Sequence, residues 1–309
     1  MPRTSRRSWR RIAILGPALA ALAAFSVPGP ASADTPLPVV YNSLAGLPGQ
    51  FSSAPPPGAN DFSCKPSAAH PRPVVLVEGT SATMALNFNA ISPLLKNNGY
   101  CVFALNYGGY GVLTATGDIP TSAGQLAAFV DKVLAATGSD KVDLVGHSQG
   151  GGVTPRWYLK FLGGAAKVAN LVGLAPSNHG ASVSGFADLL KTFPFLQVPL
   201  DALAGPAWAQ QAPGSAVLTK LNTGGDTMPG VRYTVIATKY DQVVTPYRST
   251  YLTGPDVTNI TVQDLCEQDY TEHLAIAYDH VALRVMLNSL DPAHAVQPVC
   301  SQVLPLIGG

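Results

Sequence analysis

Six short runs rich in apolar residues recur along this chain, and their spacing leaves few folds open. They lie at residues 73–77, 100–105, 141–145, 170–174, 231–236 and 257–262. Runs of this kind are typical of strands buried on both faces of a parallel sheet. Helical patterns separate them: residues 122–136 carry apolar side chains on one face, and Gly138 follows as a helix stop. The alternation predicts an α/β fold whose mostly parallel central sheet carries helices on both faces.

The N-terminal sequence has the pattern of an export signal. Five arginines and no acidic residue precede an apolar run from Ile12 to Val27, and the segment ends in Ala31-Ser32-Ala33. A basic start, a short apolar stretch and a small-residue cleavage site are typical of a secretory signal peptide. A membrane anchor is disfavoured, because the run is shorter than the roughly 20 residues that span a bilayer. We expect cleavage after Ala33, by the general secretory or the twin-arginine route, and a secreted protein without a transmembrane anchor.

The rest of the chain predicts a single domain over residues 34–309. Its first part, 34–72, is rich in Pro, Ser, Ala and Gly and is expected to form an extended lead-in. Residues 34–309 carry 14 basic and 18 acidic side chains, a net charge of −4. No electrostatic footprint for nucleic acid or anionic lipid is therefore present, and we expect a monomer.

The cysteines are even in number and all follow the expected cleavage site. Exported chains keep such cysteines as disulfides, and four of them allow three pairings. We expect Cys64–Cys101 and Cys266–Cys300, because each pair is the nearer in sequence. Buried free thiols are the less favoured alternative. A metal site is not expected, because no cysteine or histidine pair has ligand spacing.

One strand runs directly into a motif with chemical meaning. Lys141–Val145 is followed by Gly146-His147-Ser148-Gln149-Gly150 and then by a helical segment that ends near Leu162. A G-x-S-x-G motif between strand and helix forms a turn so tight that the serine is strained and its hydroxyl projects from the sheet edge. The flanking glycines let strand and helix approach closely. We therefore predict that Ser148 is a nucleophile.

A serine hydroxyl needs a base, and the base needs an acid to orient it. In strand–turn–helix sites of this type, the acid and then the histidine follow the serine along the chain. Asp241 ends an apolar strand, and His273 enters a helical segment after the last strand. We predict these two as the partners of Ser148. The competing candidates are His280 (expected two turns inside that helix), His294, Asp264, Asp269 and Glu272.

The negative charge that develops during attack on a carbonyl needs backbone N–H donors. Gln149 follows the nucleophile directly and is expected to supply one donor. Thr80, in the loop after the first core strand, is expected to supply the other.

These motifs together resemble a known family. The matching segments are 73–80, 98–108, 146–151, 240–246 and 272–274. In this order they resemble secreted bacterial lipases and esterases of the α/β-hydrolase superfamily, in particular the lipase class 2 group and its extracellular actinobacterial members. The resemblance covers about residues 64–300 and implies ester hydrolysis by Ser148, His273 and Asp241 through an acyl-enzyme.

One residue departs from the family pattern. The first motif normally reads His-Gly, whereas this chain has Glu78-Gly79. A carboxylate beside a developing negative charge opposes it unless the group points away or is protonated. The departure therefore predicts lowered or redirected activity.

The substrate side is less constrained by the sequence. The insertion 180–214 is apolar and is either a lid or acyl-chain wall, or a helix packed into the core. Phe186 and Phe193 within it, and Tyr107 before the glycine-rich stretch 108–111, are candidate substrate contacts.

We expect a small-molecule or lipid ester as substrate, met in solution or at a lipid–water interface. No metal or organic cofactor is expected. The alternatives are a cutinase-like polyester hydrolase, an extracellular acyltransferase that shares every catalytic residue, and a catalytically silent binding protein of the same fold.

Overall fold

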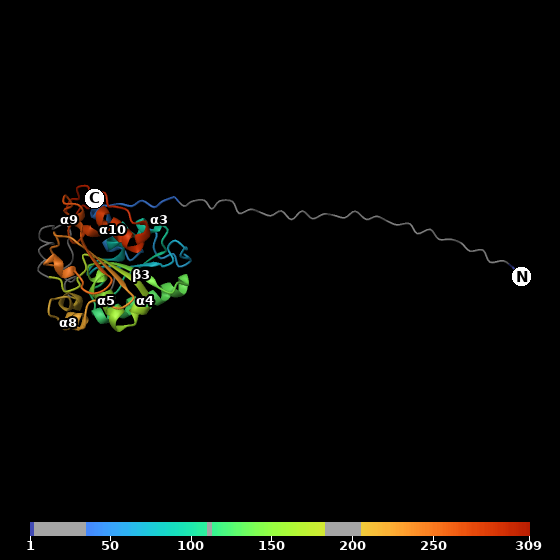
Figure 1. Ribbon diagram of the computed structural model, residues 1–309, viewed down its shortest axis with the longest axis horizontal. Coiled ribbons are helices and arrows are strands. Elements are labelled where there is room, and N and C mark those ends of the chain that lie inside the picture. Colours follow the sequence, from blue (N-terminus) through green and yellow to red (C-terminus); the bar gives the residue numbers. More distant parts are fainter. Residues whose placement is uncertain (3–34, 110–112, 183–204) are drawn as a thin grey trace. The chain divides into compact units, whose positions relative to one another are not determined.

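The computed structural model describes residues 1–2, 35–109, 113–182 and 205–309 (Figure 1). The chain divides into two units, Met1–Thr35 and Pro36–Gly309, and all the elements below lie in the second. The expected signal peptide and its cleavage site lie outside the described residues. Across the described ranges, no helix is long and apolar enough to cross a membrane.

A six-stranded, fully parallel sheet forms the centre of the domain. Its strand order is β2-β1-β3-β4-β5-β6. The strands are β1 Val74–Val77, β2 Val102–Leu105, β3 Val142–His147, β4 Val168–Leu174, β5 Arg232–Ala237 and β6 Val257–Thr261. Each corresponds to one of the six apolar runs, so the predicted α/β architecture with a parallel sheet is confirmed.

Helices cover both faces of the sheet (Figure 1). The longer ones are α3 Ile91–Asn97, α4 Ile119–Thr137, α5 Val153–Phe161, α8 Ala216–Asn222 and α10 His280–Leu290. The shorter ones are α1 Ser43–Gly46, α2 Met84–Asn87, α7 Pro206–Gln210 and α9 Val262–Leu265. Single helical turns of 3-10 type occupy Leu47–Phe51, Ser148–Gly151, Gly164–Ala166, Tyr247–Thr250, Ala275–Tyr278 and Pro292–His294.

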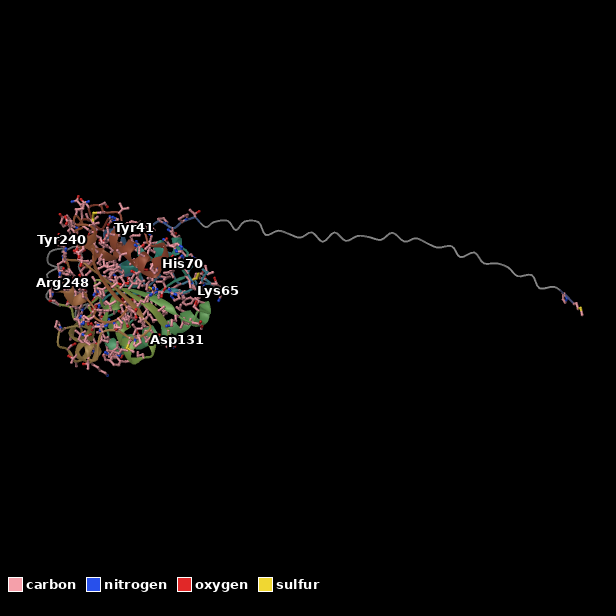
Figure 2. All side chains as sticks on the ribbon, viewed as in Figure 1. Tyr41, Lys65, His70, Asp131, Tyr240 and Arg248 are labelled. Carbon is pink, nitrogen blue, oxygen red and sulfur yellow. A yellow bond between two sulfur atoms is a disulfide. The ribbon has the colours of Figure 1, made fainter. Side chains whose placement is uncertain are left out.

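Alternation along the strands divides the core into two layers. In β1, Val74 and Leu76 pack with α3 and α10, whereas Val75 and Val77 pack with α4 and α5. Successive side chains of a strand point to opposite faces, so a run that is apolar throughout must be covered on both sides. Lys65, Asp131 and Arg248 lie at the periphery in Figure 2, outside these layers.

The lead-in is not extended throughout, which corrects the sequence expectation. Residues 43–51 form α1 and a 3-10 turn. Farther along, the Asn60 side chain donates to the Ala104 carbonyl at 2.9 Å and accepts from the Ala104 N–H at 2.8 Å. These bonds occupy backbone groups of the edge strand β2, which would otherwise be open to pairing with another chain. Local composition could not predict this role, because the partner strand is distant in sequence.

Two disulfides tie these outer segments to the domain. Cys64 is bonded to Cys101, directly before β2, and Cys266 is bonded to Cys300. These are the pairs that nearness in sequence favoured. The first anchors the lead-in, and the second anchors the C-terminal segment to the end of α9.

Candidate functional site

Ser148 occupies the turn between β3 and α5 at the carboxyl edge of the sheet. Its φ of 54° lies in the left-handed region, which non-glycine residues rarely adopt. A Cβ at Gly146 would lie 1.9 Å from the Gly150 carbonyl oxygen, and one at Gly150 would lie 2.1 Å from the Val77 carbonyl oxygen. Both glycines are therefore required by close backbone contacts. The turn holds the hydroxyl of Ser148 at the end of the central strand.

Three side chains that are distant in sequence meet at this point. Ser148 Oγ lies 3.0 Å from His273 Nε2, and His273 Nδ1 lies 2.9 Å from Asp241 Oδ2. They come from the turn after β3, the loop after β5 and the segment between α9 and α10. All three side chains are buried, and Ser148, the candidate nucleophile, is 6% exposed. This is the hydrogen-bonded order that nucleophile, base and orienting acid need.

The charge of His273 is controlled by its carboxylate neighbours. Burial acts to lower the pKa of His273, but the charge and hydrogen bond of Asp241, with the charge of Glu272, outweigh it and raise the pKa above the usual 6.5. The other oxygen of Asp241 accepts from the backbone N–H groups of Val243 and Val244 at 2.8 and 2.7 Å. Asp241 is thus fixed while Oδ2 faces the imidazole.

The loop after β1 lies against the nucleophile turn. A Cβ at Gly79 would lie 2.9 Å from His147 Nδ1 and 3.1 Å from Ser148 Cβ. Thr80 Oγ1 donates to Gln149 Oε1 at 2.8 Å, so the two residues expected to supply backbone N–H donors are linked through their side chains. The geometry brings both next to Ser148.

A family model described as the alpha/beta hydrolase fold matches residues 72–213, which include this turn and the loop after β1. The chain has the α/β-hydrolase fold. Lipase B of Aspergillus fumigatus shares it, with a TM-score of 0.62 and 20% identity over 79% of this chain and 57% of that one.

Curated relatives of this chain are named as lipases. A triacylglycerol lipase of Pseudarthrobacter phenanthrenivorans is 35% identical over 134 residues, 41% of this chain and 40% of that protein. Lipase B of Pseudozyma antarctica is 27% identical over 239 residues, 71% of this chain and 62% of that protein. The chain therefore spans less than two thirds of the length of each.

His147, inside the serine motif, supports the backbone of His273. Its Nε2 donates to the His273 carbonyl oxygen at 2.7 Å. Burial and the neighbouring charge of His273 lower the pKa of His147 to about 3, so this second imidazole stays neutral. Sequence reasoning did not assign it a role, because the motif leaves this position open.

Gln211 is a further residue that sequence reasoning missed. It is buried, and its Nε2 donates to Thr80 Oγ1 and to Gln149 Oε1, both at 2.9 Å. Its Oε1 accepts from Ser177 Oγ at 2.7 Å. Gln211 thereby joins the loops after β1, β3 and β4 beside the nucleophile. No motif marks a glutamine for this role, and only its position in the fold identifies it.

Glu78 is buried and directed toward the loop after β2. Its Oε1 accepts from the Tyr107 N–H at 3.0 Å, while Oε2 has no hydrogen-bond partner among the described residues. Burial raises the pKa of Glu78 well above its usual value, outweighing the Tyr107 hydrogen bond. Burial therefore favours the neutral form of this carboxyl group, which lacks the charge on which the expected conflict with a developing oxyanion depended.

Tyr107 does not line a pocket mouth, which corrects the sequence expectation. Its ring is 2% exposed and packs in the core layer beneath the site. Its hydroxyl donates to the Glu78 carbonyl oxygen at 2.8 Å. The phenol stays in the core because that bond satisfies its polar end.

Phe186 and Phe193 lie outside the described residues, as do positions 110–112. The described end of the insertion, 205–214, packs into the domain: α7 carries Trp208, which is buried.

The competing acids and bases have other partners. Asp264 pairs with Lys239 at the surface, and His294 pairs with Asp291. The carboxylate of Glu272 accepts from the N–H groups of Leu274 and Ala275. Asp269 and His280 belong to a separate cluster described below.

Proposed function

We propose that this domain hydrolyses carboxylic esters, with Ser148 as nucleophile, His273 as general base and Asp241 as the residue that orients the histidine. The observation that carries the proposal is the continuous row of hydrogen bonds of 3.0 and 2.9 Å across these three side chains. The strained position of Ser148 after the central strand supports it. The lipase names of the curated relatives support an ester as substrate.

The reaction begins when Ser148 Oγ attacks the ester carbonyl carbon and His273 Nε2 takes the hydroxyl proton. Asp241 stabilises the imidazolium that forms. The carbonyl oxygen becomes an oxyanion and accepts hydrogen bonds from the backbone N–H groups of Thr80 and Gln149. Collapse breaks the bond to the alcohol, which leaves with the proton from His273, and an acyl-enzyme remains.

A water molecule completes the cycle. His273 takes a proton from it as its oxygen attacks the acyl carbon, and the proton then returns to Ser148 Oγ as the acid departs. The same network thus serves both halves of the reaction. Its second half needs water at the acyl carbon, which separates hydrolysis from acyl transfer.

We further propose that the chain is exported and cleaved after Ala33. The arginine-rich, apolar N-terminus and the two disulfides support this location. Mass spectrometry of protein recovered from the culture medium should find Asp34 as the first residue. Retention in the cells of a chain that still carries residues 1–33 would contradict export.

The function is tested by hydrolysis of p-nitrophenyl acetate, butyrate, octanoate and palmitate. Replacing Ser148 by Ala should lower kcat by roughly 10³-fold or more, because the nucleophile is lost. Ser139→Ala is the matched control, since that hydroxyl donates to the carbonyl of Pro71, which precedes the amino end of β1 and so lies away from the site. The chain-length profile then divides esterase from lipase activity.

A fluorophosphonate probe separates the alternatives. If the protein is labelled, Ser148→Ala is not, and no ester is hydrolysed in water, the activity is acyl transfer rather than hydrolysis. Transfer of the acyl group to an added alcohol should then be detected. An unlabelled protein without turnover would be a silent fold, and unchanged turnover in Ser148→Ala would exclude this serine.

A further inference from the structure

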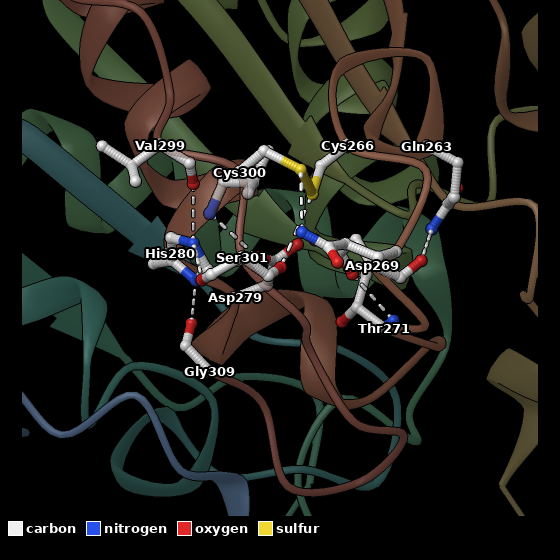
Figure 3. The surroundings of a disulfide bond; sticks show 12 residues. Gln263, Cys266, Asp269, Thr271, Asp279, His280, Val299, Cys300, Ser301 and Gly309 are labelled. Carbon is white, nitrogen blue, oxygen red and sulfur yellow. Dashed lines mark hydrogen bonds and ion pairs between the residues drawn. A yellow bond between two sulfur atoms is a disulfide. The ribbon is translucent and has the colours of Figure 1, made fainter.

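Two buried carboxyl groups face each other at the base of the segment that carries His273. Asp269 lies four residues before the histidine and Asp279 six residues after it. Both side chains are fully buried. Figure 3 shows both side chains beside the Cys266–Cys300 disulfide, and they are near enough that the charge of Asp269 raises the pKa of Asp279.

Each carboxyl group uses one oxygen for the backbone. Asp269 Oδ1 accepts from the Thr271 N–H at 2.9 Å, and Asp279 Oδ1 accepts from the Val281 N–H at 2.8 Å, which caps α10. The remaining Oδ2 atom of each acid is buried and has no hydrogen-bond partner among the described residues. Two ionised carboxylates in contact away from water repel strongly, whereas one shared proton converts the repulsion into a hydrogen bond.

The surroundings offer few charges that could replace this proton. His280, the first residue of α10, faces the pair, with Nδ1 3.9 Å from Asp279 Oδ1. Its ring also contacts the carbonyl oxygens of Val299 and Gly309 in the C-terminal segment. From α9, the neutral Gln263 side chain donates to the Asp269 carbonyl oxygen at 3.0 Å. Cys266 and Cys300 are bonded to each other and do not titrate.

The segment between the two acids is also held by hydrogen bonds from the sheet side. Thr238 Oγ1 donates to the Thr271 carbonyl oxygen at 2.6 Å, and His147 holds the His273 carbonyl oxygen. Asp269 and Asp279 stand at its two ends, so their contact closes residues 269–279 into a loop. The position of His273 relative to Ser148 is therefore coupled to that closure as well as to these bonds.

We propose that Asp269 and Asp279 are positioning residues that share one proton and so hold the His273 loop closed. The proposal rests on the proposed function, in which His273 is the base. Loss of the shared proton leaves two like charges at the base of the loop, which part and withdraw His273 from Ser148 Oγ. Burial raises the pKa of both acids, and the charge of Asp269 raises that of Asp279 further, so the pair holds its proton at a higher pH than ordinary aspartates do.

Asp279→Asn tests the shared proton directly. Asparagine caps helices as well as aspartate does, and its amide donates to Asp269 without needing a proton. With p-nitrophenyl butyrate, kcat of the unaltered protein should fall reversibly on the alkaline side while KM changes little. In Asp279→Asn that fall should move to higher pH by at least about one unit. Asp118→Asn, at the cap of α4, is the matched control and should leave it in place.

A second measurement does not depend on ester hydrolysis. A raised pKa means that the native pair holds a proton that the unfolded chain has lost. Its stabilisation is therefore complete at acid pH and is lost as pH rises through the titration of the pair. Amide hydrogen exchange of residues 270–278 should accelerate over the same pH range in the unaltered protein but not in Asp279→Asn. Asp269→Asn keeps an acceptor for the Thr271 N–H and should show the same exchange pattern as Asp279→Asn.

The outcomes separate this proposal from the function itself. The expected exchange pattern without ester turnover would uphold the closed loop and reject the function. The shared proton would be overturned if the protein hydrolyses esters but both Asn variants show the same alkaline fall in kcat and the same amide hydrogen exchange as the unaltered protein. Failure of both variants to fold would also overturn it. So would a rise in the unfolding temperature on addition of calcium chloride that EDTA reverses, because a bound cation would then take the place of the proton.

Discussion

At the scale of single residues, the hydrogen bonds available to each buried carboxyl group decide its chemistry. Asp241 receives two backbone N–H groups on one oxygen and the imidazole of His273 on the other. Glu78 receives one N–H on Oε1 and nothing on Oε2 within the described part of the chain. Both acids follow strands of the same sheet, so position along the chain does not distinguish them. The donors that favour a carboxylate are more complete at Asp241, whose two oxygens both have partners.

Replacing Glu78 by Gln should therefore change activity little. The amide keeps the shape of the neutral acid and its bond to the Tyr107 N–H, so we expect kcat/KM at neutral pH within about threefold. Because the raised pKa of Glu78 makes its stabilisation disappear as pH rises, Glu78→Gln should also be the more stable form in alkaline buffer. Esterase kinetics and urea unfolding at pH 5 and 9 check both expectations. A large loss of kcat/KM would mean that the ionised group is used.

The pH profile of hydrolysis should report the neighbours of His273. Only neutral imidazole accepts the serine proton, so kcat/KM should fall as pH drops through the raised pKa of His273. Asp241→Asn removes the charge that raises it, so the acid limb should move to lower pH and kcat should drop by about 10³-fold or more. Asp264→Asn, a surface acid paired with Lys239, is the control. If the acid limb of the pH profile did not move in Asp241→Asn, Asp241 would not be the residue that raises the pKa of His273.

At the scale of elements, junctions carry more information than the elements themselves. The strand β3 and the helix α5 match their predicted spans, and the turn between them carries Ser148. The helix after His273 differs: α10 begins at His280, which the sequence pattern placed two turns inside a longer helix. Asp279 caps α10 in an extended conformation, so the preceding residues form only a 3-10 turn. Apolar periodicity does not reveal such a break, because both parts are buried.

The β3–α5 junction predicts a severe effect at Gly150. A Cβ there would lie 2.1 Å from the Val77 carbonyl and 2.3 Å from the Glu78 carbonyl, which are backbone atoms of the sheet edge. Gly150→Ala should cost about 3 kcal/mol or more in the free energy of unfolding. Gly124→Ala is the control: nothing lies within 4 Å of its Cβ in α4, so the change should stabilise by about 0.5–1 kcal/mol. Urea unfolding measures both, and equal stabilities would refute the close contact.

At the scale of the whole molecule, the parallel sheet brings the site together. Parallel strands present their carboxyl ends at one edge, so the segments after β1, β3 and β5 meet although they are far apart in the chain. The segment after α9 reaches back over this edge with His273. Disulfides at Cys64–Cys101 and Cys266–Cys300 tie the lead-in and the C-terminal segment to this domain.

The sequence by itself determined the strands, the parallel sheet and the candidates Ser148, Asp241 and His273, because apolar periodicity and the serine motif are local signals. Only the tertiary structure decided the neutral state of Glu78, the core position of Tyr107, and the roles of His147, Gln211 and the Asp269–Asp279 pair. Each of these depends on burial and on partners brought from other strands or loops. Burial and long-range hydrogen bonds arise when the chain packs, so no window of sequence contains them.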